Sequence, residues 1–258
     1  MRVPLDQTAA EVMKIVDSCE GVLLPGSKAD VDPAKFHSPR SPRTAAADVA
    51  RNAVDELLLR DAYRLHKPVL GICYGLQSLN VFRAGSLVQH IPDFLPEELR
   101  GKVNHEAGKT VAIAHNVEIE NDSKLAQIVV GAVREVPDFN GGDEATPSGA
   151  KAHGDDGDAI AALKALRHPK ALRHPKSLSY PESISLPVNS SHHQSAEAIG
   201  DGLRIVGRCP ADGIIEALEG TAADHFVLAV QWHPERSIEL DEASRGIFRA
   251  LVDAAKGR

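Results

Sequence analysis

The feature that most constrains the fold is a cysteine between two glycines, at the point where an apolar run gives way to a helical pattern. The motif Gly71-Ile72-Cys73-Tyr74-Gly75 follows the apolar residues 68–70 and precedes a helical pattern over residues 76–82. A side chain at a sharp turn from strand to helix is lifted clear of the sheet, and the crowding there favours glycine. The pattern therefore predicts a strand, a tight turn and a helix, with Cys73 at the turn.

This position suits a reactive thiol. The free N–H groups and the positive dipole end of the following helix point at the sulfur of Cys73, and both favour the thiolate over the thiol. A cysteine at a strand end is often a small buried core residue instead. The flanking Gly71 and Gly75 favour the interpretation of Cys73 as a nucleophile.

A second motif supplies a base and a carboxylate. His233-Pro234-Glu235 follows the apolar run 226–232, so it lies just past the end of a predicted strand. Proline biases His233 towards extended backbone, in which residues two apart project to the same side. Glu235 can then orient His233 while His233 serves Cys73. Taken alone the motif is equally a surface loop, but with Cys73 it predicts a catalytic triad of a cysteine hydrolase.

Two further loops are candidate parts of the same site. A short apolar strand over residues 22–24 ends in the turn Pro25-Gly26-Ser27. A backbone N–H of Gly26 or Ser27, together with that of Tyr74, would form an oxyanion hole. The loop 189–194 carries Ser191 and His192, which we expect to contact substrate, although a plain polar loop is the alternative.

We expect no metal and no organic cofactor. The adjacent His192 and His193 suggest a metal, but the chain has neither a Cys-x-x-Cys nor a His-Glu-x-x-His spacing. The chemistry of a cysteine hydrolase also needs neither.

The apolar pattern predicts one α/β domain over residues 1–258. Strands are expected at 21–24, 68–72, 111–114, 183–187, 203–206, 214–218 and 226–232, and helices near 7–17, 44–66, 75–84, 122–130 and 240–256. Their alternation in the first half favours a parallel sheet. In the second half, residues 203–209 and 214–219 form an expected hairpin.

Residues 131–178 are a predicted disordered insertion. Much of this segment is rich in Gly, Asp, Pro and Ala, and the hexapeptide Ala-Leu-Arg-His-Pro-Lys at 165–170 is repeated at 171–176. The proline in each unit prevents one helix from continuing through both, and the period is too short for a solenoid. A mobile flap near the active site is the alternative interpretation.

Charge and cysteine content limit the classes of partner and the cellular location that we expect for this protein. With a net charge of −7 and a pI near 5.9, the chain lacks the excess of positive charge that is typical of nucleic-acid-binding proteins. No apolar run approaches the length of a membrane span. Three cysteines, an odd number at unrelated spacings, fit a reducing cytoplasm. We therefore expect a small-molecule substrate, no nucleic acid, no membrane and a cytoplasmic location; a homo-oligomer stays open.

These motifs together resemble those of the class I glutamine amidotransferase-like superfamily. Within it they are most similar to the gamma-glutamyl-gamma-aminobutyrate hydrolase branch of gamma-glutamyl hydrolases. The segments that carry the resemblance are 23–27, 30–33, 67–80, 189–194, 212–217 and 230–235. The resemblance implies a flavodoxin-like, three-layer α/β/α fold with a mostly parallel central sheet.

The resemblance also implies a mechanism. Cys73 would attack the gamma-amide carbonyl of a glutamine-like substrate, His233 would protonate the departing amine, and water would release glutamate from the thioester. Gln77 matches a position that helps to hold the glutamyl group in related enzymes.

The chain departs from the family pattern in three places. Tyr74 follows the nucleophile where the branch usually has arginine, and Ser27 stands where glycine is commoner. Family members usually carry a strand and a helix before the region that matches Val3. The first strand of the fold is therefore expected to be missing, which would leave a gap beside the nucleophile strand.

Two alternatives to a gamma-glutamyl hydrolase stay open. One is a glutaminase that supplies ammonia to a separate synthase subunit. The other is a non-catalytic relative that binds a ligand or a partner.

Overall fold

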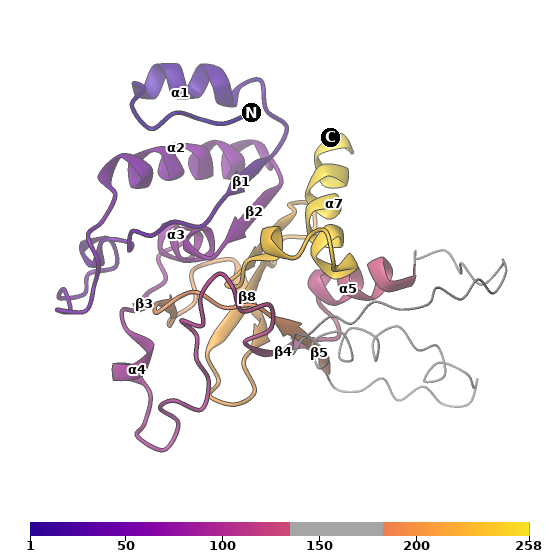
Figure 1. Ribbon diagram of the computed structural model, residues 1–258. Helices are drawn as coiled ribbons and strands as arrows, with labels where there is room; N and C mark the ends of the chain where they lie inside the picture. Colours follow the sequence, from indigo (N-terminus) through magenta and orange to yellow (C-terminus); the bar gives the residue numbers. More distant parts are fainter. Residues whose placement is uncertain (135–182, 258) are drawn as a thin grey trace, which may run out of the picture.

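A computed structural model of the protein describes residues 1–134 and 183–257. In this part of the chain, one seven-stranded sheet lies between two groups of helices (Figure 1). The strands are β1 (Val22–Leu24), β2 (Val69–Ile72), β3 (Leu87–Val88), β4 (His115–Glu120), β5 (Ser183–Val188), β6 (Ser195–Ala196), β7 (Leu203–Arg208), β8 (Ile215–Gly220) and β9 (Val227–Val230). The α-helices are α1 (Ala9–Val16), α2 (Val49–Leu65), α3 (Tyr74–Phe82), α4 (Ile91–Phe94), α5 (Lys124–Arg134) and α7 (Glu242–Lys256), with the 3-10 helices η1 (Pro33–Phe36) and η3 (Pro234–Arg236).

The large sheet has the order β1-β2-β9-β8-β7-β4-β5, and β3 pairs with β6 in a separate two-stranded sheet. The pairings β1 with β2 and β2 with β9 are parallel, and the remaining pairings of the large sheet are antiparallel. Five strands, β1, β2, β9, β7 and β5, therefore run in one direction, and β8 and β4 run in the other. Most of the strands thus share one direction, as expected. β7 and β8 form the expected hairpin.

Two hydrophobic cores account for the three layers. Strands β2 and β9 are apolar at every position, so they can bury side chains on both faces of the sheet. Val69 and Val227 pack with α1, α2 and α3 on one face. Leu70 and Leu228 pack with α5 and α7 on the other. The helices lie on opposite sides of the sheet in Figure 1, which confirms the α/β/α layers.

The structure differs from the expected elements in two places. Residues 111–114 are not a strand; the strand forms at β4, where Val117 and Ile119 alternate with polar residues and are fully buried. Residues 131–134 do not belong to an irregular insertion, because α5 continues to Arg134. The rest of the predicted insertion, with its hexapeptide repeat, lies outside the described residues.

The nucleophile strand also has no gap beside it. β2 is hydrogen-bonded to β1 on one side and to β9 on the other, in continuous register. β1 forms the edge of the sheet. Among the described helices, none is both long enough and apolar enough to cross a membrane.

Candidate active site

Cys73 lies at a strained turn between β2 and α3. Its backbone has φ 51° and ψ −104°, a region that side-chain-bearing residues rarely adopt and that costs about 1–3 kcal/mol. The two glycines explain how the turn closes. A side-chain carbon at Gly71 would lie 2.8 Å from the carbonyl of Gly75, and one at Gly75 would lie 2.1 Å from the carbonyl oxygen of Leu24. The predicted strand, tight turn and helix are therefore confirmed.

His233 reaches the same edge of the sheet from the neighbouring strand. β2 and β9 are parallel, with Ile72 opposite Val230, so the chain segments after them leave the sheet side by side. The Nδ1 atom of His233 is 2.6 Å from Oε1 of Glu235. His233 is buried, whereas the side chain of Glu235 is 44% exposed. Glu235 thus orients the imidazole, and Nε2 of His233 is left for other partners.

The loop after β1 closes the space between these two residues. A side-chain carbon at Gly26 would lie 2.8 Å from Cε1 of His233 and 3.7 Å from Cβ of Cys73. Only glycine therefore fits at this position without moving the imidazole ring. The close approach puts the backbone of Gly26 against both Cys73 and His233.

One pocket of about 890 Å³ unites the candidate residues. Its lining includes all but one of the residues singled out from the sequence: Gly26, Ser27, Cys73, Gln77, Ser191, His192, His233 and Glu235. The exception is Tyr74, whose ring is buried against Asn52 and Arg51, away from this lining. Its backbone N–H nevertheless acts on the thiol of Cys73, whose pKa it lowers.

The thiol of Cys73 is not a resting thiolate. Burial raises its pKa to about 12, although the N–H of Tyr74 and the positive charge of Arg236 act in the opposite direction. The helix end acts in the expected direction through the N–H of Tyr74, but the loss of hydration outweighs it. A base must take the proton when the thiol reacts.

The candidate substrate residues have different surroundings. Gln77 is buried and donates from Nε2 to the carbonyl of Gln194 at 3.2 Å and to Oε1 of Gln231 at 3.3 Å. His192 directs Nδ1 to the carbonyl of Gln194 at 2.9 Å, so this ring nitrogen already has a partner. Ser191 also lines the pocket.

Charged residues that the motifs did not single out also line the pocket. Lys109 and Arg236 contribute positive charge. Asp30 accepts from the backbone N–H of Ala45 at 2.6 Å and lies 2.9 Å from Nε2 of His193. That contact raises the pKa of His193. The pocket therefore offers both signs of charge to a zwitterionic ligand, and no local sequence signal marks these residues as neighbours.

Asn189 holds the backbone of His233, a contact that the sequence pattern did not reveal. Its side-chain amide donates to the carbonyl of His233 at 2.9 Å and accepts from the N–H of His233 at 3.1 Å. Both groups are buried. This paired contact fixes the backbone of His233 to the loop 189–194.

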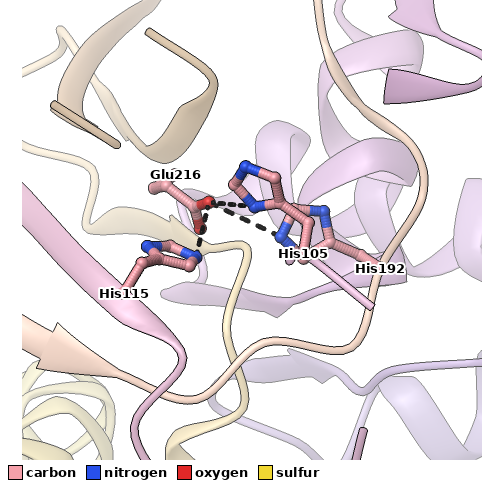
Figure 2. A group of neighbouring side chains, drawn as sticks. All are labelled: His105, His115, His192 and Glu216. Atoms are coloured by element: carbon pink, nitrogen blue, oxygen red, sulfur yellow. Dashed lines mark ion pairs between the residues drawn. The ribbon is translucent and has the colours of Figure 1, made fainter. Parts of the chain in front are cut away.

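A group of buried side chains adjoins the pocket on the side of His192. His105, His115 and His192 surround the carboxylate of Glu216, and these four residues could hold a metal ion (Figure 2). The sequence did not reveal this group, because its members come from four separate segments.

Comparison with known proteins gives concordant matches. The family model for Peptidase C26 matches residues 1–140 and 166–235. "Putative glutamine amidotransferase Rv2859c" of Mycobacterium tuberculosis is 32% identical over 94% of this chain, which spans 58% of that protein's length. The gamma-glutamyl-gamma-aminobutyrate hydrolase PuuD of Escherichia coli is 25% identical over 94% of this chain and 74% of its own length.

A solved structure shows the same fold. The glutaminase domain of Trypanosoma brucei CTPS, solved with bound acivicin, aligns with a TM-score of 0.53 at 14% identity. The alignment covers 100% of this chain and 80% of that one. At this identity, the match establishes the fold alone.

Proposed function

Because the chain belongs to the Peptidase C26 family, a hydrolytic family within the class I glutamine amidotransferase-like proteins, we propose that it hydrolyses gamma-glutamyl amide bonds of small molecules through a thioester on Cys73. The observation that carries the proposal is the convergence of Cys73, His233 and Glu235 on one pocket. A thiol, an imidazole and a carboxylate in this order are the parts of a cysteine-nucleophile hydrolase.

The first half of the reaction forms the thioester. The sulfur of Cys73 attacks the gamma-carbonyl carbon while its proton passes to Nε2 of His233. The N–H of Tyr74 and an N–H of Gly26 or Ser27 stabilise the oxyanion. His233 then gives the proton to the departing amine nitrogen, and the carbon–nitrogen bond breaks.

The second half releases glutamate. His233 takes a proton from water, and the resulting hydroxide attacks the thioester carbonyl. The carbon–sulfur bond breaks, and the proton returns to the sulfur. Glu235 stabilises the imidazolium of His233 in both halves of the reaction. The pKa of Glu235 agrees with this role: burial raises this pKa, but the contact with His233 outweighs burial and holds it below its ordinary value.

The charges of the pocket suit the glutamyl group. A free gamma-glutamyl group carries an alpha-carboxylate and an alpha-ammonium. Lys109 and Arg236 are positioned to attract the carboxylate, and Asp30 to attract the ammonium. Ser191, His192 and Gln77 lie along the same wall.

A second candidate is a glutaminase that passes ammonia to a separate synthase subunit. The names of several relatives as amidotransferases favour it. The two functions share the thioester and differ in the leaving group, which is ammonia in one and a larger amine in the other. A pocket of about 890 Å³ leaves room for a larger amine, which favours the hydrolase.

Glutamate release from a panel of gamma-glutamyl amines and glutamine tests the proposal. We expect release from at least one gamma-glutamyl amine, lost in Cys73→Ala and retained in Cys19→Ala, which removes a cysteine outside the pocket. Release from glutamine alone would favour the ammonia-supplying function. No release from folded protein would contradict both and favour a non-catalytic binding protein.

A further inference from the structure

Three imidazole rings converge on one buried carboxylate next to the pocket. Glu216 extends from β8 and is fully buried. Nδ1 of His105 lies 3.3 Å from its Oε1, Nε2 of His115 lies 3.4 Å away, and Nε2 of His192 lies 3.5 Å away. Figure 2 shows these three nitrogens pointing at the carboxylate from different sides.

The outer nitrogen of each ring faces a hydrogen-bond acceptor. Nε2 of His105 lies 2.8 Å from Oδ2 of Asp212, Nδ1 of His115 lies 3.1 Å from the carbonyl of Asn116, and Nδ1 of His192 lies 2.9 Å from the carbonyl of Gln194. Carbonyl and carboxylate oxygens only accept, so each outer nitrogen carries a hydrogen. In a neutral imidazole the other nitrogen is then a bare lone pair.

The centre of the cluster therefore holds acceptors without donors. The inner nitrogens of His105, His115 and His192, and both oxygens of Glu216, are buried and lack a hydrogen bond within the described residues. Buried polar atoms in native proteins are nearly always satisfied, and five unsatisfied atoms at one point need an explanation. A cation at this point would bind the three ring nitrogens and the carboxylate of Glu216 at once.

A proton alone is an incomplete explanation. One proton on one inner nitrogen would satisfy one oxygen of Glu216, but it would leave the inner nitrogens of the other two rings without a donor.

We propose that His105, His115, His192 and Glu216 bind a divalent transition-metal ion, for which zinc is the best match. Zinc takes imidazole nitrogens and carboxylate oxygens in a tetrahedron with bonds of about 2.0–2.2 Å, whose edges are about 3.3 Å. The three nitrogen–oxygen separations of 3.3, 3.4 and 3.5 Å match such edges, and all four ligand atoms lie within 4.8 Å of one another.

The surroundings resemble those of protein metal sites. Histidine ligands generally donate their outer N–H to a carboxylate or a carbonyl, as all three rings do here. The carboxylate of Asp212 would serve as the outer partner of His105, and it is itself held by the backbone N–H of Ile214 at 3.1 Å. The buried ring of His105 thus has a fixed orientation.

The ion would have a structural role. Four protein ligands complete a tetrahedron and leave no open position for water or substrate, which is typical of structural zinc. The ion would join the loop that carries His105 and the loop that carries His192 to the sheet, because His115 lies on β4 and Glu216 on β8. Ser191 and His193 flank His192 and line the pocket, so the ion would fix that wall.

Spectroscopic titration of the purified full-length chain tests the proposal. After chelator treatment, we expect it to bind one equivalent of Co²⁺ at pH 7.5, with the visible absorption of tetrahedral cobalt, and Zn²⁺ to displace the cobalt. His115→Ala should weaken metal binding more than about 100-fold, and Asp212→Asn, which keeps the ligands but weakens their outer partner, by about 10- to 100-fold.

Glu219→Gln is the matched control, because Glu219 is a buried carboxylate on the same strand that pairs with Arg204 at 2.7 Å outside the cluster. This variant should bind metal as the unmodified protein does. A folded chain that binds neither ion would overturn the proposal, as would equal binding by His115→Ala or, if that variant does not fold, by Asp212→Asn. The readout is metal binding, so the result is independent of whether the chain is a hydrolase.

Discussion

The side chain of Asn189 holds the backbone of His233 from both sides, accepting from its N–H at 3.1 Å and donating to its carbonyl at 2.9 Å. Because this contact fixes the chain that carries the base, Asn189→Ala should lower kcat for glutamate release by about 10- to 100-fold. KM should change less, since Asn189 does not line the pocket.

The control for this prediction is Asn104→Ala, which removes an exposed asparagine from another loop. Its kcat should match that of the unmodified protein. If Asn189→Ala folds normally and keeps full kcat, the positioning role of Asn189 is wrong.

Gly26→Ala should inactivate the protein without unfolding it. The added carbon would lie 2.8 Å from Cε1 of His233, so the ring must move away from Cys73. We expect a loss of about 100-fold in kcat, measured beside the far-ultraviolet circular dichroism spectrum. Gly131→Ala in α5 is the matched control, because nothing lies within 4 Å of its added carbon and kcat should not change. Equal activity of both variants would contradict the close approach of Gly26.

The reactivity of Cys73 should keep rising with pH. Burial raises the pKa of this thiol to about 12, so below that pH the thiolate is a minor form whose fraction grows about tenfold per pH unit. The rate of alkylation by iodoacetamide, resolved for each cysteine by peptide mass spectrometry, should therefore increase through pH 9 without levelling. A plateau below pH 8 would show that the free protein holds a stabilised thiolate instead.

A buried ion pair ties the first two helices to the sheet. Lys67 is 3% exposed; its Nζ lies 2.7 Å from Oδ2 of Asp61 and donates to the carbonyl of Val16 at 2.8 Å. Asp61→Asn leaves this ammonium without its counter-charge and should cost about 3–5 kcal/mol in the free energy of unfolding. The exposed pair of Asp253 with Lys256 provides the control: Asp253→Asn should cost less than about 1 kcal/mol.

The same pair gives the stability a pH dependence. Burial raises the pKa of Asp61, but Lys67 and Arg64 outweigh burial and hold it below its ordinary value of 3.8. A carboxyl whose pKa is lower in the folded state contributes stability above its unfolded pKa and loses it as the pH falls through its folded pKa. Chemical unfolding between pH 6 and pH 3 should therefore show a steeper acid loss for the unmodified protein than for Asp61→Asn. Parallel curves would contradict this assignment.

Local sequence patterns predicted most of the fold. The apolar runs that became β2 and β9 are buried on both faces, and such runs are read directly from the sequence. β4 was harder, because residues 111–114 form the more apolar run, whereas the strand forms where Val117 and Ile119 alternate with charged residues. The resemblance to class I glutamine amidotransferase-like proteins is confirmed by the family match.

The site could be predicted only where its residues occur in short motifs. Cys73 and His233 each follow a recognisable strand, and the parallel pairing of β2 and β9 brings them to one edge. The cluster around Glu216 has no such signal, because His105 and His192 lie on distant loops and His115 on β4, and only tertiary packing brings them to Glu216. The pKa of Cys73 likewise depends on burial, which the motif does not report.

The central claim is a covalent glutamyl thioester on Cys73, and mass spectrometry of acid-quenched protein tests it most directly. Incubation with a gamma-glutamyl amine, followed by rapid quenching and peptide mapping, should reveal a glutamyl adduct on the peptide that contains Cys73. The adduct should be absent in Cys73→Ser and should accumulate in Asn189→Ala if loss of the fixed base slows hydrolysis more than acylation. Glutamate release without any adduct on Cys73, or with full activity in Cys73→Ser, would contradict the account.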